Sequence, residues 1–191
     1  MAKKFIFFLY SSFFILHFSF AQTRMRDIYA VAPDSIFPLL TKNNRLDQID
    51  FRENNMKAEV KNRFDQPSEL LVLTDRYLKL RLSERCLVEM RLRSDSTILM
   101  VETFSGPAPD SRIRCFDMRW NEQPHAIEKP SVANFLTDDV DIDARLSLEA
   151  LPLIKASLSE NDETITFELQ LSELTKEQRK QAEGKVHGIV R

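Results

Sequence analysis

The chain has 191 residues, and its 27 lysines and arginines against 29 aspartates and glutamates give a net charge of −2 at pH 7. Because this balance creates no positive field for nucleic acid or anionic lipid, the sequence predicts no nucleic-acid partner. The three glycines are too few to build a phosphate-binding loop, which needs several of them close together. We therefore expect no nucleotide cofactor, and no residue pattern indicates another cofactor.

Residues 1–21 are predicted to be a cleaved signal peptide. A short segment with two lysines precedes the uncharged, phenylalanine-rich run 5–20, and Ser19 and Ala21 supply small residues at the −3 and −1 positions of a cleavage site. The alternative is an uncleaved membrane anchor, but the run is shorter than the roughly 20 apolar residues that a transmembrane helix needs. We expect a mature chain that begins at Gln22, is periplasmic or secreted, and has no membrane span.

The mature chain, residues 22–191, keeps 25 basic against 29 acidic residues and is long enough for one domain with a core of its own. Its first part is predicted to be helical. A helix over 25–31 stops before a proline, a short helix follows over 35–40, and Thr41 or Asn43 caps a third helix.

Residues 77–118 are predicted to form an antiparallel β-meander. Four segments alternate between apolar and polar residues, which is typical of strands with one face in the core and the other in solvent. The preceding stretch, 56–62, fits either helix or strand. The face expected in solvent carries four arginines, which form a basic patch or simply solvate that face: Arg91, Arg93, Arg112 and Arg114.

The last third of the chain is predicted to contain a polar connection over 120–145, with short helices near 131–136 and 147–151. A second hairpin pairs 153–158 with 164–171. A capping-box pattern then opens a C-terminal helix at Thr175, ending near Gly184. The predicted fold class is therefore α+β, an antiparallel β-meander packed with N-terminal and C-terminal helices.

Cys86 and Cys115 are predicted to stay unbridged, although an exported chain with two cysteines would ordinarily join them. In the expected meander Cys86 pairs with Phe104 and Cys115 with Met100, so both thiols share the apolar face on either side of a middle strand. Strand spacing then separates them by about 10 Å. A bridge needs Cα atoms within roughly 7 Å.

No catalytic or metal-binding residue emerges from the sequence. His125 and His187 have no cysteine, histidine or carboxylate at metal-ligand spacing. Asp139, Asp141 and Asp143 have the spacing of the first ligands of a calcium loop, but alanines replace its glycine and its bidentate glutamate. A solvated acidic connection is the favoured interpretation.

Several blocks of sequence point to a family. They include residues 25–27 (MRD), 33–35 (PDS), 40–51 (LTKNNRLDQIDF), 56–60 (MKAEV) and 106–111 (GPAPDS). These blocks resemble a family of uncharacterised secreted proteins from Bacteroidales, and the resemblance covers almost the whole mature chain. It implies a lineage and an exported location, but no activity and no catalytic residues.

In that lineage, two short patterns resemble acceptors for O-glycosylation of exported proteins. They are Asp34-Ser35-Ile36 and Asp95-Ser96-Thr97, so Ser35 and Ser96 are possible O-glycosylation sites. Asp34 has an alternative explanation as a helix cap.

Together these features predict a non-catalytic exported module that binds an envelope protein or a glycan. The alternative is a hydrolase with dispersed carboxylates. An enzyme would have a deep pocket with two convergent groups of perturbed pKa, whereas a binding module would expose an apolar or aromatic patch.

Overall fold

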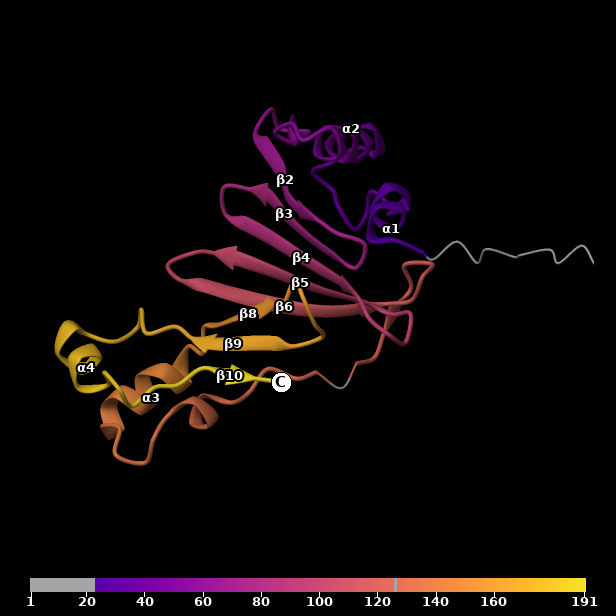
Figure 1. Ribbon diagram of the computed structural model, residues 1–191. Coiled ribbons are helices and arrows are strands. Elements are labelled where there is room, and N and C mark those ends of the chain that lie inside the picture. The colour runs from indigo at the N-terminus through magenta and orange to yellow at the C-terminus, as the bar shows by residue number, and fades with distance from the viewer. Residues whose placement is uncertain (1–22, 126) are drawn as a thin grey trace, which may run out of the picture.

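The computed structural model describes residues 23–125 and 127–191, so the predicted signal peptide lies outside the described residues. It contains a seven-stranded antiparallel sheet, in which every strand pairs with its neighbours in sequence, and a three-stranded sheet of order β10-β9-β8 (Figure 1). Helices lie at both ends of the molecule. This arrangement confirms the predicted α+β fold class with its antiparallel meander.

The elements have the following bounds. The large sheet consists of β1 (Glu59–Lys61), β2 (Pro67–Leu73), β3 (Tyr77–Ser83), β4 (Cys86–Leu92), β5 (Ile98–Ser105), β6 (Pro109–Phe116) and β7 (Glu122–Gln123). The small sheet consists of β8 (Ile154–Leu158), β9 (Ile165–Leu169) and β10 (Ile189–Val190). The helices are α1 (Met25–Val31), α2 (Lys42–Glu53), the 3₁₀ helix η1 (Val132–Phe135), α3 (Ile142–Ala150) and α4 (Lys176–Gln181).

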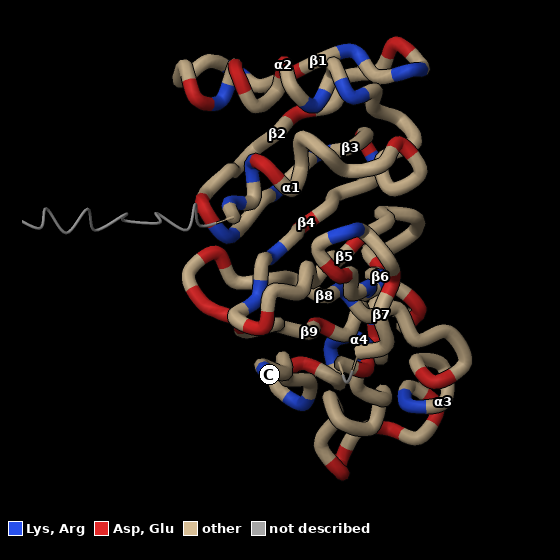
Figure 2. The backbone as a smooth tube through the Cα atoms, turned by 90° about the vertical axis from the view of Figure 1, so that its right-hand side faces the viewer, with Lys and Arg blue, Asp and Glu red and all other residues tan. Residues whose placement is uncertain are grey.

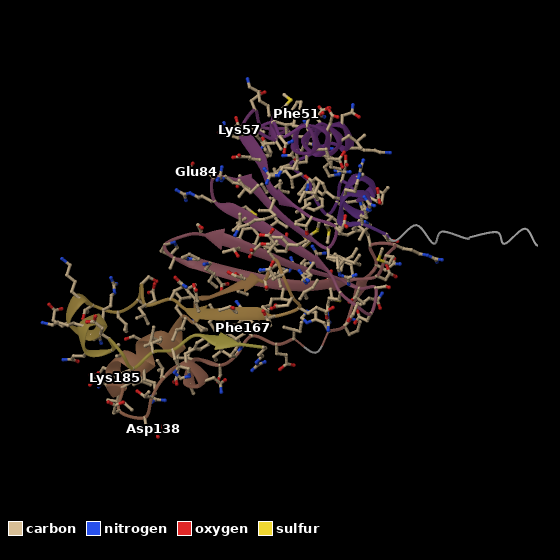
Figure 3. All side chains as sticks on the ribbon, in the orientation of Figure 1. Phe51, Lys57, Glu84, Asp138, Phe167 and Lys185 are labelled. Atoms are coloured by element: carbon tan, nitrogen blue, oxygen red, sulfur yellow. The ribbon has the colours of Figure 1, made fainter. Side chains whose placement is uncertain are left out.

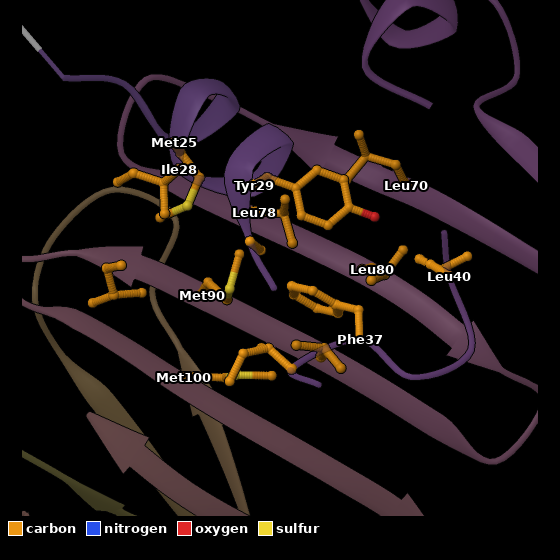
Figure 4. Packing of buried hydrophobic residues seen from close by; sticks show 14 of the residues in the cluster. Met25, Ile28, Tyr29, Phe37, Leu40, Leu70, Leu78, Leu80, Met90 and Met100 are labelled. Carbon is orange, nitrogen blue, oxygen red and sulfur yellow. The ribbon is translucent and has the colours of Figure 1, made fainter. Parts of the chain in front are cut away.

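Helices α1 and α2 cover one face of the large sheet and form the first hydrophobic cluster with it (Figure 4). Met25 and Tyr29 of α1 and Phe37 of the following loop lie over the leucines and methionines of β3 to β5. The rings of Tyr29 and Phe37 meet edge to face with centroids 5.3 Å apart. Burial of these large apolar side chains is the main force that holds the helices on the sheet.

Arg45 of α2 holds the loop between the two helices in place. Its side chain is only 1 % exposed and donates hydrogen bonds to the carbonyl oxygens of Ala32, at 2.5 Å, and Leu40, at 3.1 Å. It also donates to a carboxylate oxygen of Asp34 at 3.0 Å. The short helix predicted over 35–40 is wrong, because the loop forms turns here, and Pro38 cannot donate a helical hydrogen bond.

The second face of the large sheet is not in solvent, which corrects the prediction of one wet face. The small sheet packs over β4, β5 and β6 and buries a second hydrophobic cluster. In this cluster Tyr77, Leu99 and Val101 of the large sheet join Ala156 and Phe167 of the small one. Both faces of the central strands are therefore core.

Side chains of β6 bind the free edge of β8 where the two sheets meet. The Ala156 N–H donates to Ser111 Oγ at 2.8 Å, and the Ile154 N–H donates to a carboxylate oxygen of Asp110 at 3.0 Å. The same Asp110 oxygen accepts from Lys129 Nζ at 2.6 Å. The N–H groups of Ile154 and Ala156, which the packing of the two sheets shields from water, therefore have hydrogen-bond partners.

The two cysteines are free thiols, as predicted, but for a different reason. Cys86 pairs with Phe104, whereas Cys115 pairs with Leu99 and not with Met100. A shift of one residue moves a side chain to the other face of a sheet. Cys86 therefore belongs to the first cluster, and Cys115 points to the opposite face beside Leu99. Burial raises the pKa of the Cys86 thiol to about 11.

The remaining predictions of secondary structure are mostly confirmed. Thr41 caps α2 in a reciprocal pair with Asn44, and Thr175 opens α4 in the same way with Gln178. The hairpin of β8 and β9 lies where it was expected. The undecided stretch 56–62 contains β1, and strand β2 was not predicted at all.

Candidate binding surface

Helix α3 carries apolar side chains on two opposite sides. Ala144 and Leu148, four residues apart, are buried in the second cluster. Ile142 and Leu146, also four apart, point the other way and are 65 % and 56 % exposed. A helix that is apolar on both sides is ordinarily covered on both sides. The outer side of α3 has no cover from the described part of the chain.

The start of α3 is fixed by Asp141. Its carboxylate accepts hydrogen bonds from the N–H groups of Asp143, at 3.1 Å, and Ala144, at 3.2 Å, which is a standard N-cap. The helix predicted near 147–151 therefore begins five residues earlier, at Ile142. The acidic run that suggested a solvated connection contains this cap.

A shallow hollow of about 430 Å³ adjoins the outer side of α3, with a lining that is mostly apolar. Glu149 belongs both to this lining and to the outer side of α3, since it follows Leu146 by three residues. Leu151, 46 % exposed, comes directly after the helix. We call this surface the α3 patch. It comprises Ile142, Leu146 and Leu151 with the hollow beside them, whose walls include Pro130, Val132, Pro152 and Ile154.

The margin of the α3 patch is acidic. Figure 2 shows the acidic positions in red along α3 and the loop before it, and Figure 3 labels Asp138 at the tip of that loop. The basic side chain Arg145 is half-buried and donates to the carbonyl oxygen of Thr137 at 3.2 Å. Lys129, in the lining of the hollow, is paired with Asp110. Four exposed carboxylates therefore carry the remaining charge of the margin: Asp138, Asp141, Asp143 and Glu149.

A buried group of titratable side chains lies elsewhere, between the two sheets. Glu89 is 2 % exposed, accepts a hydrogen bond from the Tyr77 hydroxyl at 2.6 Å, and lies 3.4 Å from Lys79 Nζ. Arg91, also buried, donates to the carbonyl oxygens of Ser159 and Glu160 in the β8–β9 turn. Burial, together with the hydrogen bond to Glu89, raises the pKa of Tyr77 far above its ordinary value. Tyr77, Lys79 and Glu89 contact one another, and Arg91 joins the large sheet to the β8–β9 turn, although its buried Nε has no hydrogen-bond partner among the described residues.

The four arginines of the meander do not form a basic patch. Arg91 lies opposite Leu99 of the second cluster, while Arg114 lies opposite Met100 of the first, so they are on different faces. Arg93 pairs with Glu163 at 3.5 Å, and Arg114 pairs with Glu122 at 2.9 Å.

Other predicted residues also have clear positions. Ser35 is exposed in a turn, and Ser96 is exposed in the β4–β5 turn with a left-handed φ of 63°. Neither belongs to the α3 patch. Asp34 does not cap a helix, since its carboxylate binds Arg45 and Arg63.

The acidic run and the histidines do not come together. Asp139 pairs with Lys185 at 3.1 Å, and His125 and His187 lie on separate segments. Residues 23–125 and 127–191 contain no group of three or more cysteines, histidines or carboxylates arranged to hold a metal ion. Within these same residues, no helix has the length and apolar character to cross a membrane.

Comparison with known proteins shows the fold and the family. A solved structure, described as a domain of an uncharacterized protein from Porphyromonas gingivalis W83, superposes with a TM-score of 0.70 at 20 % identity. The match covers 86 % of this chain and 91 % of that chain, and at this identity it shows the fold alone. No curated protein matches the sequence. A family model described as "Protein of unknown function (DUF3256)" matches residues 17–187, and the chain therefore belongs to the DUF3256 family.

Proposed function

We propose that this protein is an exported, non-catalytic module that binds a protein partner through the α3 patch. The observation that carries the proposal is the exposure of Ile142 and Leu146 on the side of α3 opposite its buried residues. Contiguous exposed apolar surface with a polar margin is typical of protein interaction sites. The centre of the patch is aliphatic and, among the described residues, has no aromatic side chain on which a sugar ring could stack, which favours a protein over a glycan.

The acidic margin defines the chemistry of the partner. A complementary surface would place an apolar centre on Ile142 and Leu146 and lysine or arginine side chains near Asp138, Asp143 and Glu149. Such charges at the rim mainly steer association and select the partner, while the apolar centre supplies most of the affinity.

Binding should be lost when the apolar side of α3 is made polar. We expect the double substitution Ile142→Ser and Leu146→Ser to weaken binding of the partner about 100-fold, because central apolar side chains dominate such interfaces. Tagged protein would be cross-linked in the native envelope, and the Kd of the recovered partner then measured by titration calorimetry. Higher salt should also weaken binding, because the charged margin is exposed to screening.

The matched control is Val31→Ser, since Val31 is also 65 % exposed and on a helix, but on α1. Neither variant should move the melting temperature by more than about 2 °C, because both changes are at the surface. Equal binding by the double variant and the control would contradict the proposal. A concentration-dependent dimer that the double variant abolishes would identify a second copy of this chain as the occupant.

Export is proposed from the sequence of residues 1–21, and it has its own test. Protein recovered from the native host should begin at Gln22 or within a few residues of it, because signal peptidase cleaves after small residues such as Ala21. N-terminal mass spectrometry decides the question. A recovered chain that still carries Met1 would mean that the segment is retained.

A further inference from the structure

A second hollow, of about 440 Å³, lies at the other end of the molecule, where α1, the end of α2 and the β2–β3 turn meet (Figure 1). In contrast to the hollow beside α3, its lining is mostly polar. Three arginines converge on it from two helices and their flanks: Arg24, Arg26 and Arg52. The two carboxylates in the lining are those of Glu53 and Asp75.

The walls of this hollow are held in place by the fold. The N–H of Met25 donates to the carbonyl oxygen of Asp75 at 2.8 Å, which attaches the start of α1 to the β2–β3 turn. The buried side chains of Met25 and Ile28 fix α1 on the sheet. Arg26 reaches Glu53 at 2.5 Å and connects α1 to the last turn of α2.

The charges in the hollow do not cancel. Arg26 pairs with Glu53, and Arg24 lies 3.7 Å from a carboxylate oxygen of Asp75, so both carboxylates have a partner. Arg52 has no acidic side chain within 4.0 Å in the described part of the chain. Its position in the last turn of α2 is favourable for a cation whether or not anything binds.

We propose that this hollow binds a compact oxyanion group, a phosphate, sulfate or carboxylate, with Arg52 as its principal contact and Arg24 as its second. Guanidinium groups bind such oxygens through two parallel N–H donors. The Arg24–Asp75 contact is long, so Arg24 can turn to an incoming anion without losing a strong ion pair.

Inorganic phosphate and sulfate are the probes, titrated against chloride at constant ionic strength. At ten times its Kd, phosphate should raise the melting temperature of the exported protein by about 3 °C. Arg52→Gln should raise the Kd at least about tenfold by titration calorimetry. Asp75→Asn should lower the Kd, because it removes the carboxylate that competes for Arg24. Arg119→Gln is the matched control, since Arg119 is exposed and lies outside this hollow.

The opposite effects of Arg52→Gln and Asp75→Asn on the Kd distinguish a specific anion-binding site from a general effect of salt. No change in melting temperature for the unaltered protein would overturn the proposal. So would an equal Kd for Arg52→Gln and Arg119→Gln, or a weaker affinity after Asp75→Asn. These outcomes are independent of the α3 patch, which lies at the opposite end of the molecule.

Discussion

Replacing Phe167 by alanine should lower the free energy of unfolding by about 4 kcal/mol, because it removes a fully buried ring and leaves a cavity. Phe167 is in β9, the middle strand of the small sheet, and belongs to the second cluster (Figure 3). For a chain of this length the melting temperature should fall by roughly 10 °C. Thermal denaturation followed by circular dichroism would measure it.

The same experiment tests whether residues 22–191 form one cooperative domain. Phe37→Ala removes an equally buried ring from the first cluster, on the other side of the large sheet. Because the central strands are core on both faces, we expect each substitution to lower a single shared transition. Two transitions, with only one displaced by each variant, would contradict the single-domain prediction. Phe64→Ala, at a side chain that is 71 % exposed, should change stability by less than about 0.5 kcal/mol.

Arg45→Ala should cost about 4 kcal/mol, because it leaves the buried carbonyl groups of Ala32 and Leu40 without donors and opens a cavity beneath the loop. Arg45→Lys should recover only part of the loss. A single ammonium group cannot reproduce the forked geometry that reaches two carbonyls and a carboxylate together. Urea denaturation would give both values.

The matched control is Arg63, which contacts the same carboxylate of Asp34 as Arg45. Both side chains of the Arg63–Asp34 pair are almost half exposed. Exposed pairs contribute little, so Arg63→Ala should cost less than about 1 kcal/mol. Similar losses for the two arginines would mean that the ion pair to Asp34, and not the buried carbonyls, stabilises the loop.

Local patterns predicted most of the fold because the large sheet is a simple meander. The alternation of apolar and polar residues predicts β3 to β6, and the capping residues Thr41 and Thr175 predict where α2 and α4 begin. The sequence does not predict strand β2, because residues 70–73 form an unbroken apolar run without alternation. In the structure a bulge near Leu71 interrupts the pairing of β2 with β3. An apolar run of this length carries no period that separates strand from helix.

The polar residues of the second face could not be placed from local pattern alone. Arg91 looks like a solvated strand residue, but its partners Ser159 and Glu160 follow 68 and 69 residues later. The sequence analysis does not locate the α3 patch, because it interprets Asp141 as part of a solvated acidic connection and not as a helix cap. An aspartate followed by apolar residues at helical spacing is the signal that could have found the helix.

The contacts of Asp110 and Ser111 with β8 also bear on self-association of the folded protein. A sheet edge with free N–H groups is a template on which another extended chain can add. At β8 the N–H groups of Ile154 and Ala156 are already bound by side chains of β6. A foreign strand would have to displace these bonds first, so the junction of the two sheets resists β-aggregation as well as holding the layers together.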